Sequence, residues 1–149
     1  GSGLVGSEMC IRDRFYFGLL WNLLSTLSLS LACMAVASGD AWSKFCSAQI
    51  INILPYARKE EESKAKVIYD RMSISTWLPA FIAGGLPMWL FLNRSYWWAA
   101  LAPVAVFFLL WQLLRKRLQG YTGDCCGAAF LLCELSFYLI INLIYTNLW

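Results

Sequence analysis

The sequence contains no histidine and very few charged residues. Of its 149 residues, 14% are charged and 60% are hydrophobic, whereas soluble domains average about 25% charged and about 45–50% apolar residues. The missing histidine excludes a Ser-His-Asp triad, a Cys-His nucleophile pair and any zinc site built on histidine. The net charge of +3 is too small to indicate a nucleic-acid partner. The composition therefore excludes an ordinary soluble domain and favours a protein with several membrane spans.

Glycine and proline are scarce and 16% of the residues are aromatic, so the chain is neither disordered nor collagen-like. The six cysteines form no C-x-x-C pair, and most lie in apolar runs. Disulfide frameworks belong to small secreted domains, so we interpret the cysteines as buried small hydrophobic residues. Cys125 and Cys126 need separate attention, because they lie within a glycine-rich tract.

Residues 1–14 differ from the rest of the chain. They match neither a strand nor a helix pattern, and they lack the apolar region of a signal peptide. The segment VGSEMCIRDR resembles a translated adapter tract, so we expect a non-native tail. A short polar native tail is the alternative.

Long uncharged runs predict an all-α fold, a polytopic membrane helix bundle with about five transmembrane helices. One crossing needs about 20 apolar residues, and residues 15–57 are long enough for two crossings with a tight turn. That turn falls either at residues 25–30 or at residues 38–40. With the first option, the spans cover about residues 15–27, 30–57, 72–93, 95–114 and 126–148.

The basic residues predict the orientation of these spans. The loop at residues 58–71 contains five Lys or Arg residues and residues 115–117 add three, whereas the turn between the third and fourth spans has only Arg94. The positive-inside rule places both basic loops in the cytoplasm. We therefore expect a multi-pass protein of the cell inner (cytoplasmic) membrane, with its N-terminus inside and its C-terminus outside.

The glycine-rich tract at residues 119–128 is the strongest candidate for a functional site. It leads directly into the last apolar run, and a helix start attracts phosphate. Thr122 or Asp124 can cap this helix, and Asp124 can hold Mg²⁺ against a pyrophosphate. Candidate binding residues are three glycines and the preceding cations: Gly120, Gly123, Gly127, Arg115, Lys116 and Arg117. The alternative is an ordinary capped loop beside a solvated basic cluster.

Other charged residues are weaker candidates. Lys64 and Lys66 face the same compartment as the tract, in a loop that either is a solvated surface or covers a polyanionic ligand. Within the spans, Asp40 and Lys44 are spaced i,i+4, so they can pair on one helix face. A charge at mid-bilayer costs at least about 2.5–3.5 kcal/mol. We therefore expect Asp40, Lys44 and Glu134 to face the bundle interior, as a functional site or as polar contacts between helices.

Residues 115–142 resemble the C-terminal signature of the cobalamin synthase family, the adenosylcobinamide-GDP ribazoletransferases. That signature is a Gly-Gly-x-Thr-Gly-Asp-x-x-Gly-Ala tract that leads into a membrane helix with a glutamate. The matching residues are Gly120, Thr122, Gly123, Asp124, Gly127, Ala128 and Glu134. Ser43-Lys44 and residues 55–58 are similar to the family's Ser-Arg helix and basic loop, a register that favours the turn at residues 25–30.

Three departures from the family pattern are evident. Gln119 replaces the first glycine of the pair, and Lys44 replaces an arginine, which keeps the charge but loses the bidentate fork. The family's acidic metal motif, Asp-Gly-x-Ala-Asp-x-x-Asp-Gly, is absent from the sequence. The chain therefore resembles a C-terminal fragment of the family domain, and we expect the isolated fragment to be inactive.

The resemblance implies the final assembly of the cobalamin nucleotide loop. Family members join alpha-ribazole, or its 5'-phosphate, to adenosylcobinamide-GDP and release GMP, with Mg²⁺ as cofactor. Such phosphoryl transfer depends on positioning and charge neutralisation. The resemblance then makes Asp124 and Thr122 catalytic and Asp124 a metal ligand. The expected substrate-binding residues are the tract's glycines, the three cations that precede the tract, and Lys64, Lys66, Ser43 and Lys44.

Further expectations concern partners and competing functions. Besides the two substrates and membrane lipid, an oligomer or other cobalamin-assembly enzymes are expected partners. One alternative function is another membrane phosphotransferase, of the CDP-alcohol type. The other is a small membrane transporter or assembly subunit with Asp40, Lys44 and Glu134 as its polar pathway.

Overall fold

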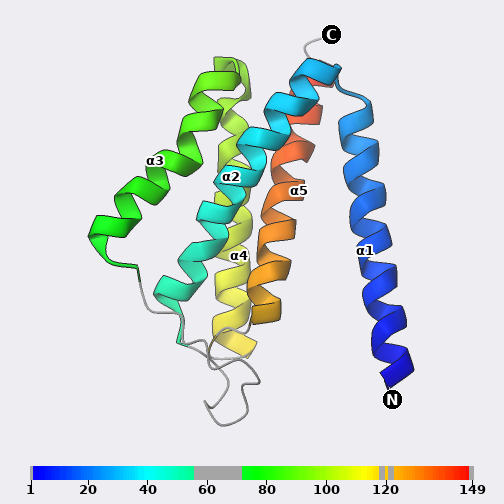
Figure 1. Cartoon of the computed structure of the whole chain (residues 1–149), viewed down its shortest axis with the longest axis vertical. Helices are drawn as coiled ribbons and strands as arrows, with labels where there is room; N and C mark the ends of the chain where they lie inside the picture. Colours follow the sequence, from blue (N-terminus) through cyan, green and yellow to red (C-terminus); the bar gives the residue numbers. More distant parts are fainter. Residues whose placement is uncertain (1, 56–71, 118–119, 121–122, 148–149) are drawn as a thin grey trace.

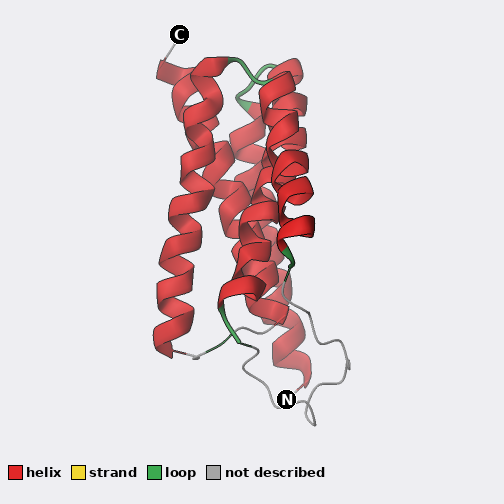
Figure 2. Cartoon of the chain, turned by 90° about the vertical axis from the view of Figure 1, so that its left-hand side faces the viewer, coloured by secondary structure: helices red, strands yellow, loops and turns green. Residues whose placement is uncertain are grey.

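The computed structural model describes residues 2–55, 72–117, 120 and 123–147, with only the backbone for residues 2–12 and for Gly123. Within this part of the chain every regular element is a helix and none is a strand (Figure 2). The predicted all-α fold is therefore confirmed. The elements are α1 (Ser2–Ser25), α2 (Leu29–Ile53), α3 (Ile74–Phe91), the 3-10 helix η2 (Arg94–Ala100), α4 (Leu101–Arg117) and α5 (Gly123–Asn147).

Three described segments are long and apolar enough to cross a membrane. They are Ile74–Phe91, Arg94–Arg117 and Asp124–Asn147, in the positions of the last three predicted spans. α1 and α2 are not among them: α1 includes the charged residues before Phe15, and α2 contains four serines with Asp40 and Lys44. That α1 and α2 also cross the membrane stays a prediction.

The first turn lies between Ser25, where α1 ends, and Leu29, where α2 begins. The alternative turn at residues 38–40 falls inside α2. Residues 2–14, which show no helical pattern in the sequence, continue α1 toward its N-terminus. A helix gains a backbone hydrogen bond with each added residue, so it can extend beyond its packed part.

The helices form a bundle with α2, α4 and α5 at its centre (Figure 1). α3 packs against α2 on one side, and α1 stands beside α5 on the other. The N-termini of α1 and α5 and the C-termini of α2 and α4 share one end of the bundle (Figure 1). The start of the glycine-rich tract's helix and the basic end of α4 are thus at the same end.

Small residues let α2 and α5 pack closely. Ala35, Gly39, Ser43 and Ser47 recur every four residues along α2, and all four are buried. This small-xxx-small spacing is typical of close helix contacts in membrane proteins. A Cβ atom on Gly39 would lie 2.6 Å from Cε1 of Tyr138 and 2.8 Å from Cδ1 of Phe137. The contact therefore requires glycine at position 39.

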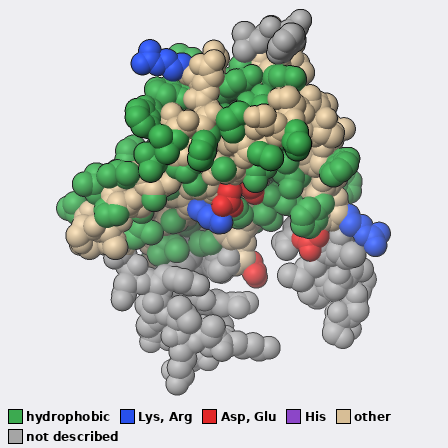
Figure 3. Space-filling view, turned by 45° about the horizontal axis from the view of Figure 1, so that its top comes forward, with side chains coloured by type: hydrophobic (Ala, Val, Ile, Leu, Met, Phe, Trp, Pro, Cys, Tyr) green, Lys and Arg blue, Asp and Glu red, His purple; other side chains and the backbone are tan. Residues whose placement is uncertain are grey.

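Among the five cysteines whose side chains the structure describes, burial varies from one position to the next. Cys46 and Cys133 are buried. Cys125 and Cys126 are half-buried and pack against a core cluster that includes Ile50, Leu114 and Ala129. Cys33 is exposed, so the prediction of burial was wrong there, because this position of α2 faces outward. Apolar side chains cover most of the surface in Figure 3, as expected for a protein surrounded by lipid.

Candidate active site between α1 and α5

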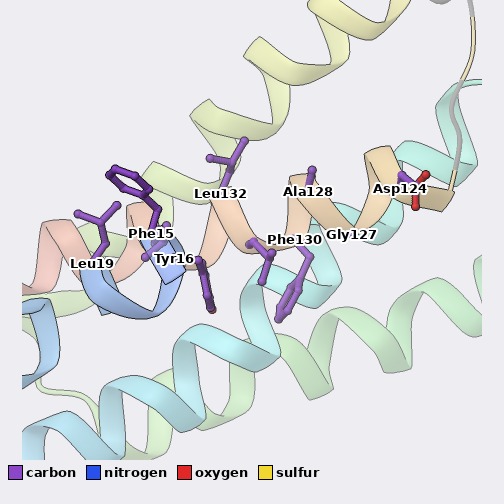
Figure 4. Close-up of a pocket in the computed structure, with 10 residues that line it drawn as sticks. Phe15, Tyr16, Leu19, Asp124, Gly127, Ala128, Phe130 and Leu132 are labelled. Carbon is purple, nitrogen blue, oxygen red and sulfur yellow. The ribbon is translucent and has the colours of Figure 1, made fainter. Parts of the chain in front are cut away.

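A groove of about 520 Å³ lies between α1 and the N-terminal half of α5 (Figure 4). In Figure 4 Asp124 is at one end of the labelled residues, and the side chains from α1 are at the other. Among the lining residues that the structure describes, Asp124 is the only charged one. The groove is thus apolar along most of its length and acidic at one end. Its lining residues are Phe15, Tyr16, Leu19, Asp124, Gly127, Ala128, Phe130, Leu131, Leu132 and Leu135.

The glycine-rich tract meets the groove at the start of α5. Asp124 lies in the first helical turn and is exposed, a position where a helix stabilises negative charge. Gly127, three residues later, also lines the groove. A Cβ atom added at Gly127 would contact no other atom within 4 Å. Gly120 is buried, and Gly123 is the first residue of α5. Thr122 lies outside the described residues, as do Lys64 and Lys66 of the basic loop.

The basic cluster forms the last turn of α4, where positive charge is favoured by the helix dipole. Arg115, Lys116 and Arg117 are all exposed. The guanidinium of Arg115 lies 5.6 Å from the ring centroid of Trp111. Arg115 and Lys116 line a separate hollow of about 500 Å³. The cluster thus shares an end of the bundle with Asp124 but does not line its groove.

Asp40 and Lys44 form the ion pair that their spacing predicts, with Nζ and Oδ2 2.8 Å apart. The expectation that both face the bundle interior was wrong for the described helices. The Lys44 side chain is 62% exposed and that of Asp40 is 40% exposed, because the described helices leave this face of α2 partly open. Nζ of Lys44 lies 5.6 Å from the ring centroid of Phe130, which lines the groove. Lys44 is therefore a neighbour of the groove.

Ser43 is fully buried, and within the described residues its Oγ atom has no hydrogen-bond partner. It belongs to the buried small-residue stripe of α2. The structure therefore places Ser43 in helix packing, whereas its neighbour Lys44 points to the surface.

Glu134 is buried with 7% exposure, as expected for a charge within a span. It accepts a hydrogen bond from the hydroxyl of Tyr16 at 2.5 Å and another from the hydroxyl of Tyr138 at 2.6 Å. Tyr16 also lines the groove, so this contact ties α1 to α5 beside the candidate site. Sequence reasoning missed both tyrosines. The i,i+4 spacing of Glu134 and Tyr138 was a usable signal, whereas Tyr16 is 118 residues away.

The described residues offer a limited site for a metal ion. Among them, no three Cys, Asp or Glu side chains lie close enough together to hold one. Mg²⁺ is commonly bound by one or two carboxylates together with substrate phosphates. Asp124 fits that mode as a single ligand, because it is exposed at the groove end.

Apolar helices packed through small residues, with a groove that is polar at one end, define a helical membrane protein. The family model of cobalamin-5-phosphate synthase matches residues 6–142, and the chain belongs to this family. The resemblance seen in the glycine-rich tract is thus confirmed. The match begins within residues 1–14; whether that segment is native stays a prediction.

Several curated relatives are named adenosylcobinamide-GDP ribazoletransferase. The protein from Polaromonas sp. is 33% identical over 115 residues, which are 70% of this chain and 39% of the relative. The protein from Shewanella putrefaciens is 33% identical over 133 residues, 85% of this chain and 49% of the relative. The chain thus spans about half the length of the curated relatives it matches. No solved structure matches the chain.

Proposed function

We propose that this chain contributes the C-terminal part of an adenosylcobinamide-GDP ribazoletransferase. The reaction would join alpha-ribazole, or its 5'-phosphate, to adenosylcobinamide-GDP and release GMP. One observation carries the proposal: the family's tract lies at the start of α5, where Asp124 is the charged residue of the groove. Membership of the family is the basis for the choice of substrates.

In the proposed reaction, a ribose hydroxyl of alpha-ribazole attacks the phosphate that bears the cobinamide. The hydroxyl gives its proton to solvent as the new P–O bond forms on that phosphorus, the bond to GMP breaks, and GMP leaves with the electron pair. Little covalent chemistry is asked of the protein, so its residues position the substrates and neutralise charge. The backbone N–H groups of the tract at Gly120, Thr122 and Gly123 would hold phosphate oxygens at the helix start. Gly127 would leave room for the substrate, because it has no side chain on the groove.

We propose a separate role for Asp124, as a ligand for a metal ion. Its carboxylate is exposed in the first turn of α5, where it would repel a bound pyrophosphate unless a cation lay between them. Bound Mg²⁺ would supply that neutralisation. Asp124 is therefore the proposed metal ligand of this chain. Lys64, Lys66 and the Arg115–Arg117 cluster would attract the anionic substrate to this end of the bundle, whereas Lys44 is paired with Asp40 nearer the middle of α2.

The proposal includes a location for the enzyme. We place the chain in the inner membrane, with the shared end of α4 and α5 in the cytoplasm. The three cations at the end of α4 support this orientation through the positive-inside rule. A soluble nucleotide-linked substrate would then reach Asp124 from the cytoplasm.

Complementation tests the proposed function. The part of the Shewanella putrefaciens relative that precedes its segment similar to residues 15–149 is joined ahead of Phe15, and this chimera is expressed in a bacterium that lacks its own synthase and requires cobalamin. We expect the chimera to restore growth on cobinamide, and the isolated 149-residue chain not to. Growth with the isolated chain would contradict its expected inactivity. Failure of a well-expressed, membrane-inserted chimera would contradict the proposed function.

A further inference from the structure

α1 is held to the bundle along one side only. It packs against α5, with Leu20, Leu23 and Leu24 reaching the core near its C-terminal end. Toward its other end, Phe15 is 71% exposed and Leu19 is 52% exposed, and both line the groove of about 520 Å³. Apolar side chains of α1 and α5 thus leave a groove that is long, open and unfilled by the described helices.

The neighbouring face of α2 is charged at mid-length. Asp40 and Lys44 lie near the middle of a 25-residue helix, and Lys44 adjoins Phe130 at the groove wall. Figure 3 shows positive and negative side chains side by side within a mainly apolar surface. Exposing such a pair to hydrocarbon is costly, so charges in membrane helices face protein or water. Lipid alone is therefore a poor cover for this face.

The curated relatives are longer than this chain. About half of their length has no counterpart in this chain, which is enough sequence for several helices. We propose that the groove and the Asp40–Lys44 pair together form the docking surface for an apolar helix from that other half. This helix would carry aliphatic or aromatic residues along Leu19 and Leu132, and one polar or acidic residue level with Lys44.

This arrangement would complete the wall of the groove and leave its end at Asp124 open. It goes beyond the proposed function and does not depend on it, because a contact between helices can be measured without turnover. A chimera that fails to make cobalamin can still show the contact. Conversely, an active chimera that lacks the contact would overturn only the docking surface.

Photo-crosslinking in the chimera tests the docking surface. A benzoylphenylalanine probe replaces Leu132, which lines the groove and is 47% exposed, and a protease site is placed just ahead of Phe15. After irradiation in membranes and cleavage, the added part and this chain should remain joined. Matched probes at Leu109 on α4 and Ile82 on α3, which are 67% and 53% exposed, should give several-fold less joined product.

Three results would overturn the proposal: equal yields from all three probes, a Leu132 probe linked to a second copy of the chain, or one linked only to lipid. The ion pair offers a second measurement that leaves the groove intact. Lys44→Glu places two like charges on this face and should lower the Leu132 yield several-fold, whereas Lys44→Arg should keep it. Equal yields from these two variants would contradict a polar residue opposite Lys44.

Discussion

Asp124→Asn in the chimera is expected to lower the rate of cobalamin formation by about 100-fold or more, the usual cost of removing one charge-stabilising group from an active site. Asparagine keeps the size of the side chain and its place in the first turn of α5 but removes the negative charge. The amide is a weaker ligand for Mg²⁺ than a carboxylate. The rate should therefore fall while the expression level and the detergent elution profile stay unchanged. The measurement is the initial rate at saturating adenosylcobinamide-GDP and alpha-ribazole.

Thr146→Val is the matched control for this prediction. Thr146 is exposed near the other end of α5, and within the described residues its hydroxyl donates hydrogen bonds to the backbone of its own helix, at Asn142 and Leu143. Its loss should leave the rate within about twofold of the unmodified chimera, since surface changes of this kind usually alter stability by less than about 0.5 kcal/mol. A near-normal rate for Asp124→Asn would contradict the proposed role of Asp124 in the reaction.

Gly39→Ala is expected to produce the largest loss of stability. The added methyl group would lie 2.6 Å and 2.8 Å from ring atoms of Tyr138 and Phe137, and both rings are fully buried. Tyr138 is also held by its hydrogen bond to Glu134, so it cannot move without weakening that contact. Overpacking of this kind costs about 1–3 kcal/mol. Each kcal/mol should lower the unfolding temperature in detergent by about 2–4 °C.

Gly18→Ala separates this clash from the general effect of replacing a helical glycine. A Cβ atom at Gly18 would have nothing within 4 Å, and alanine favours a helix by about 1 kcal/mol over glycine. The unfolding temperature of Gly18→Ala should therefore equal or exceed that of the unmodified chain. Equal unfolding temperatures for the two variants would show that α2 and α5 do not pack through Gly39.

The sequence was sufficient to predict the helical fold, and its glycine-rich tract singled out a residue that lines the groove. Uncharged runs identified the three described segments that are long and apolar enough to cross a membrane, because burial in lipid requires about 20 such residues whatever their neighbours. The glycine-rich tract pointed to Asp124, which the structure places at the end of the groove. The spacing of Asp40 and Lys44 predicted their ion pair, since helical neighbours four residues apart face each other.

Contacts between distant helices could not be predicted in this way. The bond from Tyr16 to Glu134 joins residues 118 positions apart, and nothing local specifies it. The burial of Ser43 and the exposure of Lys44 depend on which face of α2 meets α5. The buried stripe of small residues that includes Gly39 was a readable signal for that face. The cations at the end of α4 were expected beside the tract, but Arg115 and Lys116 line a different hollow.

The stoichiometry of products from the purified chimera tests the central claim most directly. The claim is that residues 15–149, with Asp124 at the groove end, form part of a site that transfers cobinamide phosphate to alpha-ribazole. Incubation with adenosylcobinamide-GDP and alpha-ribazole should yield adenosylcobalamin and GMP in equal amounts, measured by mass spectrometry, and Asp124→Asn should slow the formation of both by about 100-fold or more. Release of GMP without adenosylcobalamin, or no conversion by a correctly folded chimera, would contradict it.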